Sequence, residues 1–467
     1  MFPRSLLGVV SVNRSNPAMR FSYVLLIVVL LGRSTGFGET GGASQSAAGQ
    51  AWRFDFGPGD VAAGYQAVKP DAVFSAERGF GFDLGTAAVV GGVDRGGADV
   101  LRGDFCTGDA PFYFSIAVPE GNYRVTVTLG DRSEITNTTI KAESRRLMVE
   151  DLSTEPGEFV TRSFMVNVRN STLPPPPQNA PGGSRVVLNE REQGVLHWDD
   201  KLTLEFNGAR PAVCALEIEP VTDVITVFLA GDSTVTDQPY EPGASWGQML
   251  PRFFNDKVAI ANHAESGETM KSFITALRFD KLLSAMKPGD YLFIQFGHND
   301  SKSQWPQTYV EPFTTYKAYL KVFIAEARRR GATPVLITSM HRRVFDGEGR
   351  IKNTHGDYPE AVRQVAREEN VALIDLHAMS ASLYEALGPE KSPLAFSANG
   401  RDATHHNNYG AYQLAQCVVT GIREAGLPLA SMLTADAPRF DPARPDPVEA
   451  FSLPASPVRS NLKPRGD

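Results

Sequence analysis

The chain has 467 residues, enough for two or three domains with separate cores, and its 42% apolar and 21% charged residues are ordinary for a globular protein. The net charge of −7, without a basic stripe interleaved with aromatic residues, argues against a nucleic-acid partner. The cysteines Cys106, Cys214 and Cys417 form no CxxC pair, which excludes zinc-ribbon and redox motifs. Cys106 and Cys214 either pair within one domain or stay as buried thiols.

The N-terminus carries the pattern of a targeting segment. Two arginines precede an apolar run of nine residues from Tyr23 to Leu31, and small and polar residues follow. The run is shorter than the about 20 residues that span a bilayer, and it fits the hydrophobic region of a signal peptide. We therefore expect residues 1–48 to be a signal peptide and flexible segment, cleaved near Ala48. The protein would then be exported, to the periplasm or outside the cell, and a short membrane anchor is the alternative.

Residues 51–220 show the period of short, half-buried strands. Apolar and polar residues alternate from Tyr123 to Leu129, from Leu202 to Phe206 and from Cys214 to Ile218, and Phe112 to Val118 is an apolar run. Turn residues separate these runs, and helical periodicity is absent from this part of the sequence. The pattern predicts an all-β sandwich, and we expect it to provide no catalytic group.

From residue 221 to residue 435, buried strands alternate with helices. Continuous apolar runs are typical of a parallel sheet covered on both faces. Strands are predicted at Val224–Ala230, Val258–Ala261, Tyr291–Phe296, Pro334–Thr338 and Ala372–Ile374, and helices at Tyr316–Arg330, Tyr358–Glu369 and Asn408–Glu424. The alternation predicts a doubly wound α/β domain. Residues 436–467 contain seven prolines and little apolar periodicity, and we expect a tail without a fixed fold.

Four polar motifs lie where open parallel sheets bind ligands, beyond the carboxyl ends of their strands. Each alone also fits an ordinary polar turn. They are Gly231-Asp232-Ser233-Thr234, the segment Asn262 to Gly267, Gly297-His298-Asn299-Asp300, and Asp402-Ala403-Thr404-His405 before the last predicted helix.

The residue types in these motifs suit acyl transfer. A serine after a strand can project its hydroxyl into the crevice, and a carboxylate three residues before His405 can orient the imidazole. The side-chain amide of Asn299 can face a developing oxyanion, and Gly267 lets a backbone N–H approach a ligand. A metal site at Asp402, His405 and His406 is the alternative, but no ligand cluster of matching spacing supports it.

In their order, the four motifs resemble the four signature blocks of the SGNH (GDSL-type) hydrolase superfamily, over roughly residues 225–425. The resemblance implies a flavodoxin-like parallel sheet, here preceded by the all-β sandwich. It implies Ser233 as nucleophile, His405 as general base and Asp402 as the residue that orients the base. It also implies an oxyanion hole formed by the N–H groups of Ser233 and Gly267 and the side chain of Asn299, with no cofactor and no metal.

Within that superfamily the chain is most similar to the rhamnogalacturonan acetylesterases. Thr234, the segment Ser245-Trp246-Gly247-Gln248 and the segment from Asn262 to Phe273 carry this similarity. The run from Phe54 to Gly57 resembles the galactose-binding-like sandwich that precedes bacterial members. One departure is Glu268-Thr269, where many members of the group carry Arg-Ser.

The similarity implies an O-acetyl esterase whose partner is an acetylated plant polysaccharide, with the pectic polysaccharide rhamnogalacturonan as the expected substrate. Trp246 and Asp232 are weaker candidates for substrate contact, and Trp246 alternatively packs in the core. The sandwich either positions the polymer or covers apolar surface of the α/β domain. We expect no stable membrane partner.

Two other functions remain open from the sequence. One is an esterase for another acetylated glycan, such as xylan, or for small acyl esters. The other is an inactive carbohydrate-binding protein, which is disfavoured because such a protein would need none of Ser233, Asn299, Asp402 or His405.

Overall fold

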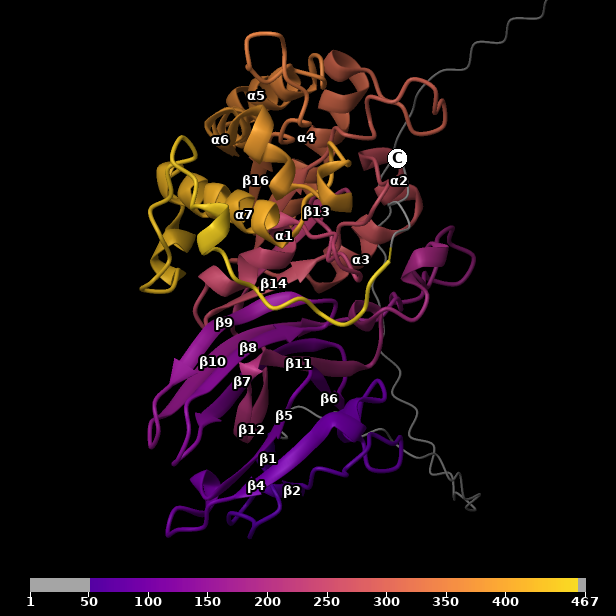
Figure 1. The fold of residues 1–467 in the computed structure, drawn as a ribbon. Helices are drawn as coiled ribbons and strands as arrows, with labels where there is room; N and C mark the ends of the chain where they lie inside the picture. Colours follow the sequence, from indigo (N-terminus) through magenta and orange to yellow (C-terminus); the bar gives the residue numbers. More distant parts are fainter. Residues whose placement is uncertain (1–50, 461–467) are drawn as a thin grey trace, which may run out of the picture. The chain divides into compact units, whose positions relative to one another are not determined.

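The computed structural model describes residues 51–460, and the signal peptide expected at residues 1–48 lies outside them. The N-terminal part of the described chain contains two mainly antiparallel sheets (Figure 1). One has the strand order β10-β7-β12-β1-β2, with β5 also on β12 and β4 on β5, and the other has the order β3-β6-β11-β8-β9. The strands are β1 (Trp52–Phe56), β2 (Gln66–Val68), β3 (Phe80–Asp83), β4 (Val90–Asp94), β5 (Asp104–Gly108), β6 (Phe112–Ala117), β7 (Gly121–Gly130), β8 (Thr136–Ala142), β9 (Arg146–Thr154), β10 (Phe159–Val168), β11 (Lys201–Arg210) and β12 (Ala212–Val221).

The alternating pattern places one apolar core between these sheets. Val125 and Val127 of β7 are buried in the same cluster as Phe114 of β6, and the rings of Phe54 and Phe114 meet edge to face at 5.2 Å. The predicted β-rich N-terminal domain is therefore confirmed. Cys106 and Cys214 are both buried free thiols.

The C-terminal part is built on one parallel five-stranded sheet. Its order is β14-β13-β15-β16-β17, which is the flavodoxin-like order 2-1-3-4-5 when its strands are counted along the chain. The strands are β13 (Ile225–Gly231), β14 (Val258–Asn262), β15 (Tyr291–Gln295), β16 (Thr333–Ile337) and β17 (Ala372–Ile374). The predicted doubly wound fold is confirmed.

Helices cover both faces of this sheet because its strands are apolar on both sides. Val227 and Leu229 of β13 belong to the core under α1, α6 and α7, whereas Phe228 and Ala230 belong to the core under α2 to α5. The helices are α1 (Trp246–Met249), α2 (Met270–Thr275), α3 (Arg278–Ala285), α4 (Lys317–Arg329), α5 (Tyr358–Glu369), α6 (Leu376–Lys391) and α7 (Asn408–Glu424). Within residues 51–460, none of them is long and apolar enough to cross a membrane.

The expectation that the C-terminal segment lacks a fixed fold is wrong for residues 436–460. This segment, here called the strap, first receives hydrogen bonds at Asp446 from side chains of α7. It then passes Lys141 of β8, whose Nζ donates to Pro454 O at 2.6 Å and to Ser456 Oγ at 2.8 Å. Prolines suit such an extended path because they have no backbone N–H that needs an acceptor, so a proline-rich composition fits an extended, packed segment as well as disorder.

Candidate active site

Three neighbouring strands bring the predicted motifs to one edge of the parallel sheet. The motif of Ser233 follows β13, that of Gly267 follows β14, and that of Asn299 follows β15. Since β14, β13 and β15 are adjacent and parallel, their carboxyl ends meet. His405 reaches the same edge from the turn before α7.

Ser233, His405 and Asp402 form one hydrogen-bonded series. Ser233 Oγ lies 2.9 Å from His405 Nε2, and His405 Nδ1 lies 2.9 Å from Asp402 Oδ2. The other carboxylate oxygen of Asp402 accepts the N–H groups of Thr404 and His405. Burial alone would raise the pKa of Asp402, but the hydrogen bonds and charge of His405 and these N–H groups hold it well below its usual value. Asp402 is therefore a fixed anion that orients the imidazole.

The next residue, His406, faces the opposite way. Its Nε2 lies 2.7 Å from the hydroxyl of Tyr384, and its ring packs on Phe396. Burial lowers the pKa of His406 to about 3. His406 is therefore a neutral core residue, and it does not join Asp402 and His405 as a third ligand.

The proposed oxyanion donors also meet at this edge. Asn299 Nδ2 donates one hydrogen to Glu268 O at 3.1 Å, which fixes the amide and leaves its second N–H available. Gly267 has φ +82°, a conformation that costs glycine little. Within residues 51–460, the backbone N–H groups of Ser233 and Gly267 donate to no protein acceptor. The oxyanion hole formed by these three donors stays a prediction.

Trp246 and Asp232 are both buried and do not line the site surface. Trp246 is 1% exposed and its Nε1 donates to Gln295 Oε1 at 2.8 Å in the core beneath α1, so the core-packing alternative is correct. Asp232 is fully buried, and its Oδ1 accepts the N–H and hydroxyl of Thr234. Both side chains are satisfied by protein partners, and the substrate contacts expected of them stay a prediction.

Asp232 instead braces the turn of Asn299. Its Oδ2 lies 3.4 Å from His298 Nδ1. Burial would raise the pKa of Asp232, but the charge of His298 and the hydrogen bonds of Thr234 lower it. Asp300 accepts the N–H of Gly297 at 3.1 Å and that of Met270 at 3.0 Å, which ties the turn to the start of α2.

A hairpin of the N-terminal domain, not predicted from the sequence, holds the loop after Ser233. Between β8 and β9, Arg145 donates to the backbone oxygens of Gln238 and Gly243 and pairs with Glu241 at 2.6 Å. Arg146 Nε pairs with Asp237 Oδ2 at 2.6 Å, and both side chains are fully buried. Arginines in a turn between two strands are usually solvent-exposed, so the sequence holds no signal for this role.

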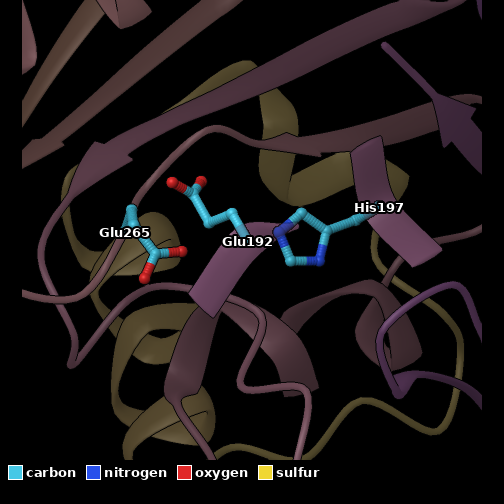
Figure 2. Close-up of side chains that lie close together, drawn as sticks. All are labelled: Glu192, His197 and Glu265. Atoms are coloured by element: carbon cyan, nitrogen blue, oxygen red, sulfur yellow. The ribbon is translucent and has the colours of Figure 1, made fainter. Parts of the chain in front are cut away.

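A second buried cluster, Glu192, His197 and Glu265, lies near the loop of Gly267 (Figure 2). One potential ligand atom from each residue lies within 4.8 Å of the others. Both oxygens of Glu192 are already taken, however: Oε1 accepts from Arg278 and Trp198 Nε1, and Oε2 from Arg278 and the N–H of Asn189.

The charges around this cluster also disfavour a cation. Burial lowers the pKa of His197 well below its usual value, and the guanidinium groups of Arg169 and Arg146 lower it further. Burial and the neighbouring carboxylate of Glu192 raise the pKa of Glu265 to about 7. The donor set therefore fits an ion-pair network around Arg278 better than it fits a metal.

Comparison with known proteins matches the two parts of the described chain to two different family models. A model of the GDSL-like lipase/acylhydrolase family matches residues 229–413. A model described as the β-agarase/YXIM esterase-like, galactose-binding domain-like family matches residues 52–170.

Among individual relatives, rhamnogalacturonan acetylesterase RhgT of Bacillus subtilis (strain 168) is 43% identical over 218 residues, 44% of this chain and 92% of the relative. The uncharacterized esterase YxiM of the same organism is 26% identical over 388 residues, 80% of this chain and 91% of the relative. The crystal structure of the B. subtilis YxiM protein is matched at 25% identity with a TM-score of 0.43, over 81% of this chain and 99% of that one. The similarity to RhgT covers less than half of this chain, whereas the similarity to the YxiM sequence covers most of it.

Proposed function

Because the chain belongs to the GDSL-like lipase/acylhydrolase family and is an ester hydrolase, we propose that it removes O-acetyl groups from pectic polysaccharide, with rhamnogalacturonan as substrate. The observation that carries the proposal is the series from Ser233 Oγ through His405 to Asp402, with both distances at 2.9 Å. Ser233 is the proposed nucleophile, His405 the general base, and Asp402 the residue that orients it.

The proposed reaction has two steps. Ser233 Oγ attacks the acetyl carbonyl carbon while His405 Nε2 takes its proton, and the carbonyl oxygen becomes an oxyanion held by the N–H groups of Ser233 and Gly267 and by Asn299. His405 then gives the proton to the leaving sugar oxygen, and the acetyl group stays on Ser233. A water molecule next attacks the acetyl-serine as His405 takes its proton, and acetate leaves as Ser233 regains a proton.

The choice of rhamnogalacturonan is supported by the 43% identity to RhgT, which spans nearly all of that relative. The catalytic residues themselves act on any acetyl ester, so the sugar must be selected by surfaces beside them. Acetylated xylan and small esters are therefore the substrates to compare with acetylated rhamnogalacturonan.

The test is acetate release from these polysaccharides by the wild-type protein and by Ser233→Ala. The variant is expected to lose at least about 10⁴-fold in kcat, because nucleophile and base act as one unit. Ser382→Ala removes a hydroxyl from an exposed position on α6 and serves as the matched control. Release from xylan alone contradicts the substrate assignment, and an active Ser233→Ala contradicts the mechanism.

We also propose that the protein is exported, on the basis of the apolar run from Tyr23 to Leu31 after two arginines. Expression in a Gram-negative host with and without residues 1–48 tests this. Acetylesterase activity is expected in the periplasm only for the longer chain, and equal retention of both chains in the cytoplasm contradicts export.

A further inference from the structure

A cleft of about 760 Å³ begins at Gly267 and is lined by both parts of the described chain. This volume lies within the about 300–1,000 Å³ typical of ligand pockets. One wall is Val187 to Asn189, from the segment between β10 and β11. The rest of the lining comes from Gln304 to Thr308, Ser266 to Glu268 and part of α2.

The lining chemistry suits a sugar chain. Trp305 is half-buried, and Lys302 Nζ lies 4.4 Å from the centre of its ring. The C–H face of a pyranose ring is apolar and packs against an aromatic ring, while its hydroxyls need hydrogen-bonding partners. Amide and hydroxyl side chains at Asn189, Gln304 and Gln307 offer both donors and acceptors.

The wall from the N-terminal part is held firmly in place. Val187 N donates to Ala276 O at the end of α2, at 2.9 Å. Five residues further, Glu192 forms the buried ion pair with Arg278, and Arg278 Nε lies 3.3 Å from Glu268 Oε1. Glu268 in turn follows Gly267, so the wall and the proposed oxyanion loop share one ion network. Such a wall is preorganised and costs little ordering entropy when a ligand binds.

Resting on the proposed function, we propose that this cleft binds the pyranose units that flank the acetylated sugar, with one unit stacked on Trp305. Segment 187–189 then makes the N-terminal half of the chain a part of the polysaccharide subsite. Continuity supports this assignment, because Gly267 belongs both to the cleft and to the proposed oxyanion hole. A sugar chain whose acetyl ester lies at the Ser233 hydroxyl would therefore continue into the cleft.

The first test compares Trp305→Ala with Phe313→Ala, which removes an exposed aromatic ring that does not line the cleft. For Trp305→Ala we expect kcat/KM on acetylated rhamnogalacturonan to fall about tenfold or more, as loss of a ring contact predicts. The kcat/KM for p-nitrophenyl acetate should stay within about twofold, because this ester does not extend into the cleft. Phe313→Ala should change neither. An equal loss on both substrates, or no loss on the polymer, overturns the proposal.

A second pair of variants tests segment 187–189 and leaves Trp305 unchanged. Val187 is 62% exposed, so Val187→Glu fills the cleft with little risk to folding, and Val322→Glu on α4 is the matched control. Deacetylated rhamnogalacturonan should inhibit hydrolysis of p-nitrophenyl acetate by the wild type and by Val322→Glu, but not by Val187→Glu. Equal inhibition of all three overturns the role of segment 187–189.

These outcomes are separable from failure of the proposed function. If wild-type protein releases acetate from the polymer and Ser233→Ala does not, the proposed function stands whatever the cleft variants do. If the wild type releases no acetate from any polysaccharide, the proposed function and the cleft assignment both fail.

Discussion

At the scale of single residues, the surroundings decide which of two adjacent histidines can act on Ser233. His405 uses Nδ1 for Asp402, and this leaves Nε2 directed at the serine hydroxyl. His406 is the next residue in the chain and has the same side chain, but its Nε2 lies against the hydroxyl of Tyr384 and its ring is buried. The three-residue spacing from Asp402 predicts this choice, because a turn of that length returns the imidazole to the carboxylate.

We therefore predict different failures for the two histidines. His405→Ala should lower kcat by about 10⁴-fold or more and leave the fold intact, because it removes the base. His406→Ala should keep kcat within about tenfold but lower the free energy of unfolding by about 1–3 kcal/mol, because it leaves the buried Tyr384 hydroxyl unpaired. Urea denaturation and initial rates on p-nitrophenyl acetate separate the two effects. An inactive but fully stable His406→Ala contradicts the assignment.

The second residue-scale prediction concerns pH. The pKa of Asp402 is well below its usual value because the hydrogen bonds from His405 and Thr404 outweigh burial. Asp402 therefore stays ionised while His405 gains its proton, and log kcat/KM should fall with a slope of one on the acid side. Exhaustive chelation should leave the rate unchanged. A slope of two on the acid side shows that a second group must also lose a proton.

At the scale of elements, the sequence predicts the strands and helices of the α/β part well, but it does not predict the hairpin of the N-terminal domain that packs against them. The helices α5 and α7 have the predicted bounds, and β13 is shifted by one residue, because periodicity and apolar runs are local signals. The hairpin between β8 and β9 carries no such signal. The carboxylates that pair with Arg145 and Arg146 belong to Glu241 and Asp237, about 90 residues further along the chain, and only the tertiary fold brings these groups together.

This hairpin also changes the expected role of the N-terminal domain. Leu147 of β9 is fully buried in the same core as Trp246 and Leu250, so the domain covers apolar surface of the α/β part. No side chain of the hairpin belongs to the hydrogen-bonded series of Ser233, His405 and Asp402. The hairpin does, however, provide Arg146, the ion-pair partner of the buried Asp237. A chain that begins at Val221 would therefore keep a buried carboxylate without its cation.

We predict that Arg146→Ala lowers the free energy of unfolding by about 3–5 kcal/mol, because Asp237 is then a buried charge without its partner. Arg146→Met with Asp237→Leu removes both charges and should recover much of this loss. Arg162→Ala, an exposed arginine on β10, is the matched control. Urea denaturation of the wild type and the three variants gives their free energies of unfolding, and an Arg146→Ala protein as stable as wild type contradicts the role of this ion pair.

At the scale of the whole molecule, several buried carboxyl groups favour their neutral forms. Burial and the charge of Glu192 raise the pKa of Glu265 to about 7, and burial and the charge of Asp232 raise that of Asp300 to about 7. Burial also raises the pKa of Glu143 to about 8. For each group the folded state binds a proton more tightly than the unfolded state.

The sign of the linkage then predicts a protein that is more stable at mildly acidic pH. Between the unfolded values near 4 and the folded values near 7, the folded state holds more protons, so stability falls as pH rises. The buried His197 and His406 act in the opposite sense, because their lowered pKa values make stability rise as pH rises to about 6.5. Tm should therefore be highest near about pH 6.5 and lower at pH 8. Glu265→Gln should flatten this dependence, since its share is on the order of 3 kcal/mol, whereas the exposed Glu348→Gln should not. A Tm that rises steadily from pH 5 to pH 8 in the wild type contradicts the prediction.

The strap has a consequence for the order in which the protein is made. Lys141 and Glu205 lie in the first half of the chain, yet Ser456 hydrogen-bonds to both, and its N–H reaches Glu241. A polypeptide leaves the ribosome from its N-terminus. Lys141, Glu205 and Glu241 therefore cannot bond to Ser456 until residue 456 has been synthesised. The contacts between the strap and Lys141 can likewise form only after this segment has been synthesised. A chain that stops before Pro454 would leave the buried Lys141 without two of its acceptors.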